Sequence, residues 1–286
     1  MTQLVVYSFV GSQWAGVVHL TLAQKGFIKG QDYEVKEVDL GQADNFAPEY
    51  LKVNPNGTVP SLTSPSLPAP ISDSVDILRY LDSLRGGNRL VPENADTRAK
   101  GQRIVDLVHS SQVDTNVIFF NARSVDELDA KKGNWHKQFL DARQQRLEQE
   151  HQADPAHPFY GPKMKENGQV QSKYQSSIGH GDEEFFTKSH ELHRQFAAGM
   201  ETLESLLVLP FAAGDAISEA DFHVIPWLSH AMVAANSDPK NIQDFSAMEK
   251  ELQKSATGFK IGPRTRQWWA TVAKEPSFQQ VFPHLH

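Results

Sequence analysis

The segment Asn54-Pro55-Asn56-Gly57-Thr58-Val59-Pro60-Ser61-Leu62 decides the fold of the first third of the chain, together with Asp73-Ser74 a few residues later. Asn-Pro-Asn-Gly is a turn sequence, and the residues after it predict a short strand that contains Pro60. A second short strand is expected over residues 69–72. Asp73-Ser74 then opens an amphipathic helix that runs to Arg85 and ends before two glycines.

Around this segment the pattern predicts alternating strands and helices. Strands are expected over residues 4–8 and 33–40, where β-branched and apolar residues recur. Helices are expected over residues 14–25 and 48–53. The resulting order, β-α-β-α-β-β-α, predicts an α/β domain of residues 1–86 and not a helical bundle or a β-sandwich.

Beyond Gly87 the strand pattern disappears, and the sequence predicts an all-helical domain of residues 94–286. Helical periodicity is expected over residues 96–128, 134–149, 183–207, 219–235 and 264–274. The polar stretch of residues 150–182 contains several prolines and glycines and has little apolar periodicity. We therefore interpret it as a long loop or insertion that is partly ordered at best.

The bulk composition argues against several classes of function. The chain has 28 Lys and Arg against 35 Asp and Glu, a formal net charge of -7, which argues against binding to nucleic-acid phosphates. No apolar run reaches the roughly 18 residues that a membrane helix needs. The first seven residues are typical of a strand and not of a signal peptide. We expect a cytoplasmic protein with neither a nucleic-acid nor a membrane partner.

The chain has no cysteine and 12 histidines. A disulfide, a thiolate metal site and a redox cysteine pair are therefore excluded, and any thiol that reacts here must come from a ligand. The densest histidine group, His180, His190 and His193, lies in or beside the polar stretch and forms no His-Glu-x-x-His pattern. We expect no metal site.

Three positions have both a structural and a functional interpretation. Pro60 is an edge-strand or turn proline; with a cis peptide bond, it would turn the backbone of Val59 outward to pair with an extended peptide. Asp73 and Ser74 form an N-cap, or they hold the charged groups of an α-amino acid at a helix N-terminus. Ser12 is a helix cap, or its hydroxyl donates to a ligand thiolate and lowers the pKa of that thiol.

In this order and spacing, the three positions resemble the thioredoxin-like domain of cytosolic glutathione transferases. The resemblance is carried by Asn54-Pro55-Asn56-Gly57-Thr58-Val59-Pro60 followed by Asp73-Ser74-Val75-Asp76-Ile77. In the helical half, Ser218-Glu219-Ala220-Asp221 resembles the capping box of that family. Trp268-Trp269 and the Glu275-Pro276 that follows resemble its last helices.

The resemblance implies a serine-type glutathione transferase with glutathione as its co-substrate. Ser12 would be the catalytic hydroxyl that activates the thiol. The backbone of Val59, before cis-Pro60, would pair with the cysteinyl residue, and Asp73 and Ser74 would hold the γ-glutamyl end. The absence of cysteine excludes the thioltransferase chemistry of cysteine-type members.

The glycyl carboxylate has no clear anchor, because the positions that often carry a basic or amide residue for it read Asn45-Phe46 and Thr58 here. Lys52 is a candidate substitute. In this family the second substrate binds between the domains, and five residues are candidates to line that hydrophobic pocket: Phe9, Val10, Trp14, Phe119 and Phe120.

The resemblance predicts conjugation of glutathione to a hydrophobic electrophile, or reduction of a peroxide, in detoxification. The alternative is a protein of the same fold that binds hydrophobic ligands with little or no turnover. By analogy with the family, a homodimer is expected.

Overall fold

A three-stranded sheet with the order β2-β1-β3 forms the centre of the N-terminal part in the computed structural model, which describes residues 4–175 and 183–285. β1 runs parallel to β2 and antiparallel to β3. The strands are β1 (Leu4–Ser8), β2 (Tyr33–Glu37) and β3 (Ser61–Thr63).

One expected strand does not form. Over residues 69–72 the chain makes only a single bridge, between Leu62 and Ile71. Pro68 and Pro70 explain the difference, because a proline has no N–H with which to extend a ladder of hydrogen bonds.

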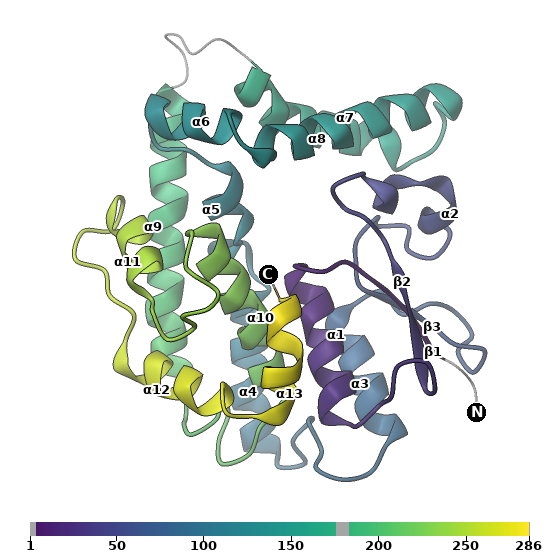
Figure 1. Cartoon of the computed structure of the whole chain (residues 1–286), viewed down its shortest axis with the longest axis vertical. Coiled ribbons are helices and arrows are strands. Elements are labelled where there is room, and N and C mark those ends of the chain that lie inside the picture. The colour runs from purple at the N-terminus through teal and green to yellow at the C-terminus, as the bar shows by residue number, and fades with distance from the viewer. Residues whose placement is uncertain (1–3, 176–182, 286) are drawn as a thin grey trace.

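Helices flank the sheet in the predicted order, which confirms the thioredoxin-like α/β fold of this part (Figure 1). Ser12 and Asp73 begin two of them, because each side-chain oxygen accepts from backbone N–H groups of the first helical turn. The helices are α1 (Gln13–Gln24), α2 (Pro48–Leu51) and α3 (Ser74–Leu84), with the 3-10 turn η1 (Asp44–Phe46) before α2.

The rest of the described chain is helical. In the residues that the structure covers, no helix is both long enough and apolar enough to cross a membrane. The α-helices are α4 (Ala95–Val108), α5 (Asn116–Phe120), α6 (Val125–Lys132), α7 (Trp135–Ala153), α8 (Tyr160–Gln175), α9 (Glu183–Leu206), α10 (Glu219–Ala234), α11 (Ser246–Gln253), α12 (Pro263–Val272) and α13 (Pro276–Val281). Two further 3-10 turns are η2 (Ser111–Val113) and η3 (Phe282–His284).

The continuous helical pattern expected over residues 96–128 is broken into α4, α5 and α6. The break docks in the core at Val113, whose carbonyl accepts from the indole N–H of Trp227 at 2.9 Å. Val113 packs so tightly on Gly199 of α9 that a Cβ on that glycine would lie 2.1 Å from it. Long-range packing of the buried Val113 thus overrides the local helical pattern.

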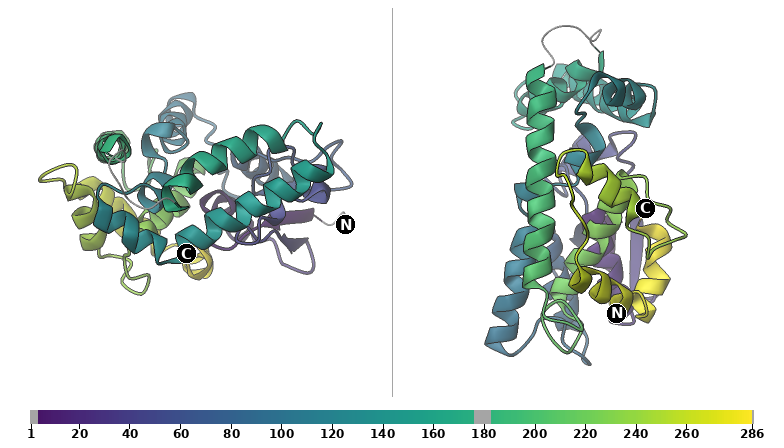
Figure 2. Two further views of the ribbon diagram at one scale, coloured as in Figure 1. Left: turned by 90° about the horizontal axis from the view of Figure 1, so that it is seen from above. Right: turned by 90° about the vertical axis from the view of Figure 1, so that its left-hand side faces the viewer.

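The interpretation of residues 150–182 as a loop is wrong for the part that the structure describes, since α8 covers most of it; residues 176–182 lie outside the described part. α7 and α8 pair as two antiparallel helices, which we call the arm (residues 135–175). The arm extends from the helical part across to η1 and α2 (Figures 1 and 2). Its buried contacts include polar groups, which is why hydrophobic periodicity does not reveal α8. The buried side chains of α8 are Tyr160, Asn167, Gln171 and Tyr174.

A second contact between the two parts lies where α1 and α3 pack against α10, and we call it the base. There α1 and α3 contribute Val17, Leu20 and Leu78 to the same buried cluster as Phe222 and Trp227 of α10. α10 itself begins at the predicted capping box. The carboxylate of Asp221 accepts from the backbone N–H of Ser218 at 2.9 Å and from that of Ala212 at 2.8 Å.

Candidate functional site

The strand register brings the three functional positions to one end of the sheet. Tyr7 of β1 pairs with Ser61 of β3, and Leu62 pairs with Ile71, both antiparallel. Continuing the first register by two residues sets Val59 level with Phe9, just after β1, and continuing the second by three sets it level with Ser74 at the start of α3. The first turn of α1, at Ser12, follows β1 at the same end. Ser12, Val59 and Asp73-Ser74 therefore share this edge, as the functional interpretation requires.

Ser12 is the half-buried N-cap of α1. Its Oγ accepts from the backbone N–H of Ala15 at 3.4 Å, a long bond. Because this bond uses the oxygen as an acceptor, the hydroxyl proton stays available for a ligand. The other nearby serine is engaged: the buried Ser8 lies 2.8 Å from His19 through Oγ and Nε2.

Val59 precedes a cis peptide bond to Pro60. Within the described residues, no backbone hydrogen bond involves the N–H or the C=O of Val59. The backbone of Val59 therefore has a donor and an acceptor without a partner in the described part of the chain, and an extended peptide could pair with both.

Asp73 is exposed, and its Oδ1 accepts from the N–H groups of Val75 at 2.8 Å and Asp76 at 3.3 Å. Ser74, the first residue of α3, is buried. Capping leaves Oδ2 of Asp73 outside the hydrogen bonds seen among the described residues. A ligand ammonium and a helix cap are therefore compatible at this carboxylate.

Lys52, the candidate anchor for the glycyl carboxylate, forms an ion pair at the surface. Its Nζ lies 2.8 Å from Oε1 of Glu49 in a pair whose side chains are mostly exposed. Asn45 is instead buried: its amide donates to the carbonyl of Gly57 at 2.6 Å, while its Oδ1 is buried without a partner in the described chain. Asn45 thus fixes the turn before Val59.

The five pocket candidates fall into three places. Phe9 packs beside Val59 in a small cluster on the sheet, and Val10 is exposed. Trp14 stacks on His109 of the helical part, with ring centroids 4.0 Å apart and an angle of 16° between the planes. Trp14 therefore belongs to the contact between the two parts, on the side of α4.

Phe119 and Phe120 lie at the end of α5 against the start of the arm. The Phe119 ring is 5.6 Å from Trp135, and the Phe120 ring stacks on Phe139 at 5.6 Å. On its other side, Phe119 lies 4.7 Å from the ring of His230 of α10. These rings form an aromatic wall that joins α5, α10 and α7.

A polar chain that the sequence analysis missed connects this wall to the first turn of α1. Thr115 donates to the side-chain oxygen of Gln13 at 3.1 Å, and Nδ1 of His230 lies 2.8 Å from the same hydroxyl. Burial lowers the pKa of His230 to about 4, so the imidazole is neutral at pH 7. Since the threonine proton goes to Gln13, Nδ1 of His230 carries a proton and Nε2 a lone pair. Nothing in sequence spacing signals this contact between residues about a hundred positions apart.

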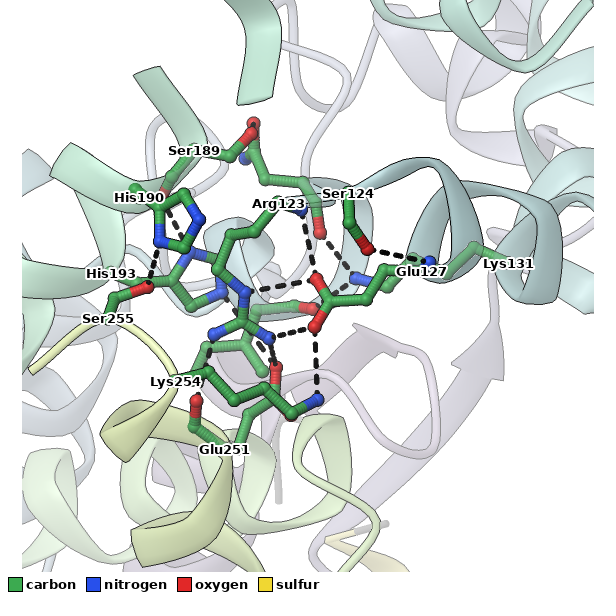
Figure 3. Close-up of polar contacts among 12 residues, drawn as sticks. Arg123, Ser124, Glu127, Lys131, Ser189, His190, His193, Glu251, Lys254 and Ser255 are labelled. Carbon is green, nitrogen blue, oxygen red and sulfur yellow. Dashed lines mark hydrogen bonds and ion pairs between the residues drawn. The ribbon is translucent and has the colours of Figure 1, made fainter. Parts of the chain in front are cut away.

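Ionic contacts hold α5, and with it the aromatic wall, in place (Figure 3). Lys131 donates to the carbonyls of Ile118 and Asn121, each at 2.6 Å, at the C-terminal end of α5. Burial lowers the pKa of Lys131 to about 8. The buried Arg123 pairs with Glu127 at 2.8 Å and also with Glu251 of α11.

The histidines of the predicted densest group serve this framework. Nδ1 of His190 lies 2.9 Å from Ser255 Oγ, and Nδ1 of His193 lies 2.7 Å from the carbonyl of Ser189. His180 lies outside the described residues. No group of three or more His, Cys, Asp or Glu side chains in residues 4–175 and 183–285 is arranged to hold a metal ion.

Comparisons with known proteins agree with this geometry. Residues 6–89 match the family model "Glutathione S-transferase, N-terminal domain". Glutathione S-transferase 1 of Dianthus caryophyllus is 36% identical over 106 residues, which are 37% of this chain and 45% of that protein. Maleylacetoacetate isomerase of Rattus norvegicus is 33% identical over 108 residues, 37% of this chain and 47% of that protein. The matched segments thus span about half the length of these relatives.

Solved structures extend the similarity of fold to the helical part. A maleylacetoacetate isomerase of Methylobacterium extorquens, solved with malonate and GSH, superposes with a TM-score of 0.59 at 21% identity and covers 99% of this chain and 97% of its own. A beta-etherase of Sphingobium gives a TM-score of 0.63 at 18% identity, with 98% of each chain covered.

Proposed function

We propose that this chain, whose residues 6–89 match the glutathione S-transferase N-terminal domain, belongs to that family, binds glutathione and joins its sulfur to an electrophile. The observation that carries the proposal is the backbone of Val59, which makes no hydrogen bond among the described residues and which the strand register sets level with the end of β1 and the start of α3. The peptide pairs with Val59, its α-amino-acid end lies at Asp73 and Ser74, and its thiol lies at Ser12. The absence of cysteine makes the ligand thiol the only thiol of the reaction.

Ser12 activates that thiol by hydrogen bonding. A free thiol has a pKa of about 8.5. Donation from the hydroxyl to the thiolate, together with the positive end of α1, stabilises the charged form and lowers this pKa by about one or two units. The thiolate then attacks an electrophilic carbon bound at the aromatic wall. Formation of the C–S bond expels a leaving group with its electron pair or, where a double bond is conjugated to a carbonyl, gives an enolate that takes a proton from water.

The wall of Phe119 and Phe120 favours a hydrophobic second substrate. Conjugation in detoxification is the activity that we propose, with peroxide reduction as a related outcome, in a homodimeric protein of the cytoplasm. Ligand binding without turnover is the alternative, and an assay of conjugate formation distinguishes the two.

Substitution Ser12→Ala tests the mechanism. We expect conjugation of a chlorinated nitroaromatic to fall about ten- to a hundredfold, because a hydrogen bond to a charged group contributes roughly 1.5 to 3 kcal/mol. The pH dependence of the conjugation rate should shift upward by about one or two pH units, because the thiolate loses the hydrogen-bond donor that stabilises it.

Ser8→Ala is the matched control, because the hydroxyl of Ser8 is engaged with His19, and it should leave the profile unchanged. A Ser12→Ala protein with wild-type rates between pH 6 and 8 removes Ser12 from the mechanism. Tight binding of glutathione and of aromatic ligands by the wild-type protein, with no conjugate formed, supports the alternative.

A further inference from the structure

Arg143, on α7 of the arm, carries a positive charge without an acidic partner. Its guanidinium makes no hydrogen bond or ion pair that is seen among residues 4–175 and 183–285, and the side chain is partly buried. Its Cζ lies 4.3 Å from the ring centroid of Phe46 and 5.1 Å from that of Phe139. Stacking on ring faces leaves the in-plane N–H donors of a guanidinium unused. An unpaired charge on a partly buried side chain loses part of its hydration, and an anionic ligand would compensate that loss.

The arginine one turn away shows the contrast. Arg146 forms an ion pair with Glu150, with 2.8 Å between Nε and Oε1, although its buried Nε–H is not aligned for a hydrogen bond. The negative charge of Glu166 raises the pKa of Arg143, but the Glu166 carboxylate makes its ion pair with Lys163, at 2.9 Å. Burial lowers the pKa of Arg143 to about 10, so the group stays charged at neutral pH.

Arg143 reaches the N-terminal part beside the peptide edge. Phe46, on which it stacks, follows Asn45, and the amide of Asn45 holds the carbonyl of Gly57 at 2.6 Å, two residues before Val59. The arm also touches this turn directly: a Cβ on Gly57 would lie 2.7 Å from Cζ of Phe159. The arm therefore covers the side of Val59 that includes η1 and α2.

A tripeptide on this edge must end beneath the arm. Its α-amino-acid end lies at the start of α3, and its middle residue pairs with Val59. An extended chain continues in the same direction at about 3.3 Å per residue, away from α3 and toward Asn45 and Phe46. The far end of glutathione is a free carboxylate, for which a planar guanidinium is a bidentate partner.

We propose that Arg143 of the arm binds the glycyl carboxylate of glutathione. The inference rests on the proposed function, since it presumes that glutathione occupies the sheet edge. The arm then supplies the anchor for which the N-terminal part offers only Asn45, Thr58 and the exposed Lys52. It also makes the site selective for thiol peptides with a free C-terminal carboxylate.

Calorimetry with two ligands and two variants tests the proposal. The ligands are glutathione and its glycyl ethyl ester, which lacks the charged carboxylate. We expect the wild-type protein to bind glutathione about ten- to a hundredfold more tightly than the ester, the effect of one charge-assisted contact. Arg143→Met keeps an apolar stem between the two rings; it should weaken binding of glutathione by the same factor and leave binding of the ester unchanged.

Arg146→Met is the matched control on the same helix, and it should retain the preference for glutathione. Equal affinity of the wild-type protein for the two ligands overturns the inference, even if Arg143→Met fails to fold. So does a variant that loses affinity equally for both. Failure of the proposed function differs from either outcome, because the wild-type protein then binds neither ligand at millimolar concentration.

Discussion

The base and the arm connect the same two parts of the molecule by different means. At the base, Val17 and Leu20 of α1 join a large apolar cluster with α10. At the arm, Leu147 and Tyr160 cover Phe46 in a small cluster beside polar and charged groups. An apolar contact of the first kind stabilises the fold in proportion to the area it buries, whereas the second adds donors and charge at the edge of the site. The comparison indicates a structural role for the base, whereas ligand binding is the role that we propose for the arm.

The largest effect is expected from Gly16→Val at the base. A Cβ on Gly16 of α1 would lie 2.5 Å from Cδ2 of Leu285 and 2.6 Å from Cβ of Pro226 in α10. Because Pro226 lies within a buried helix, α1 and α10 must separate. The free energy of unfolding, measured by urea titration, should fall by about 3 kcal/mol or more. A loss below about 1 kcal/mol would show that the base adapts easily, and the contrast with the arm would not hold.

A smaller and more local effect is expected from Phe159→Ala in the arm. Phe159 packs on Phe46 with ring centroids 5.4 Å apart and is only partly buried. Its removal should cost about 2 kcal/mol, below the usual range for a fully buried phenylalanine. Amide hydrogen exchange should accelerate in α7 and α8 and stay unchanged in α1 and α10. Equal acceleration in all four helices would mean that arm and base unfold as one unit.

Acid should weaken the base through His223. Burial holds the pKa of this fully buried imidazole well below its ordinary value. Burial also lowers the pKa of the neighbouring His109, whose Nε2 lies 2.9 Å from Nδ1 of His223. The unfolded chain binds the proton at a pH of about 6.5 and the folded chain does not. The free energy of unfolding is therefore unaffected by the titration of His223 above that pH. It declines as the pH falls below it, by about 1.4 kcal/mol per pH unit for one histidine.

Urea titrations between pH 7.5 and 4.5 measure this slope. His223→Gln should reduce it by about one proton, while the other buried histidines, such as His230 and His193, still contribute. A variant with the wild-type slope would place the proton uptake elsewhere.

The smallest effect is a gain, from Gly168→Ala in α8. The nearest side-chain atom to a Cβ there is Oε1 of Gln144 at 3.6 Å, an ordinary contact. Alanine in a helix interior is favoured over glycine by about 0.5 to 1 kcal/mol. The melting temperature should rise slightly and hydrogen exchange in the arm should slow. A loss of stability would indicate that α7 and α8 pack too closely at Gly168 to accept a methyl group, as α1 and α10 do at Gly16.

Local sequence determined the N-terminal part and the edge of its site. Asn54 to Gly57 make a turn, Asp73 begins α3, and Ser12 begins α1, all through contacts within a few residues in the chain. The apolar faces of α1, α3 and α10 were readable for the same reason, because a buried helix face repeats every three to four residues.

The helix expected over residues 134–149 is α7 of the arm, but only the tertiary structure decided α8 and the aromatic wall. α8 is held by Asn167, which donates to the carbonyl of Leu140 at 3.1 Å, and by Tyr174, which donates to that of Phe120 at 2.8 Å. Such bonds join single polar residues over tens of positions and leave no period in the sequence. The charge of Arg143 beside Phe46, like the contact of His230 with Thr115, exists because distant helices meet, and sequence spacing does not encode that meeting.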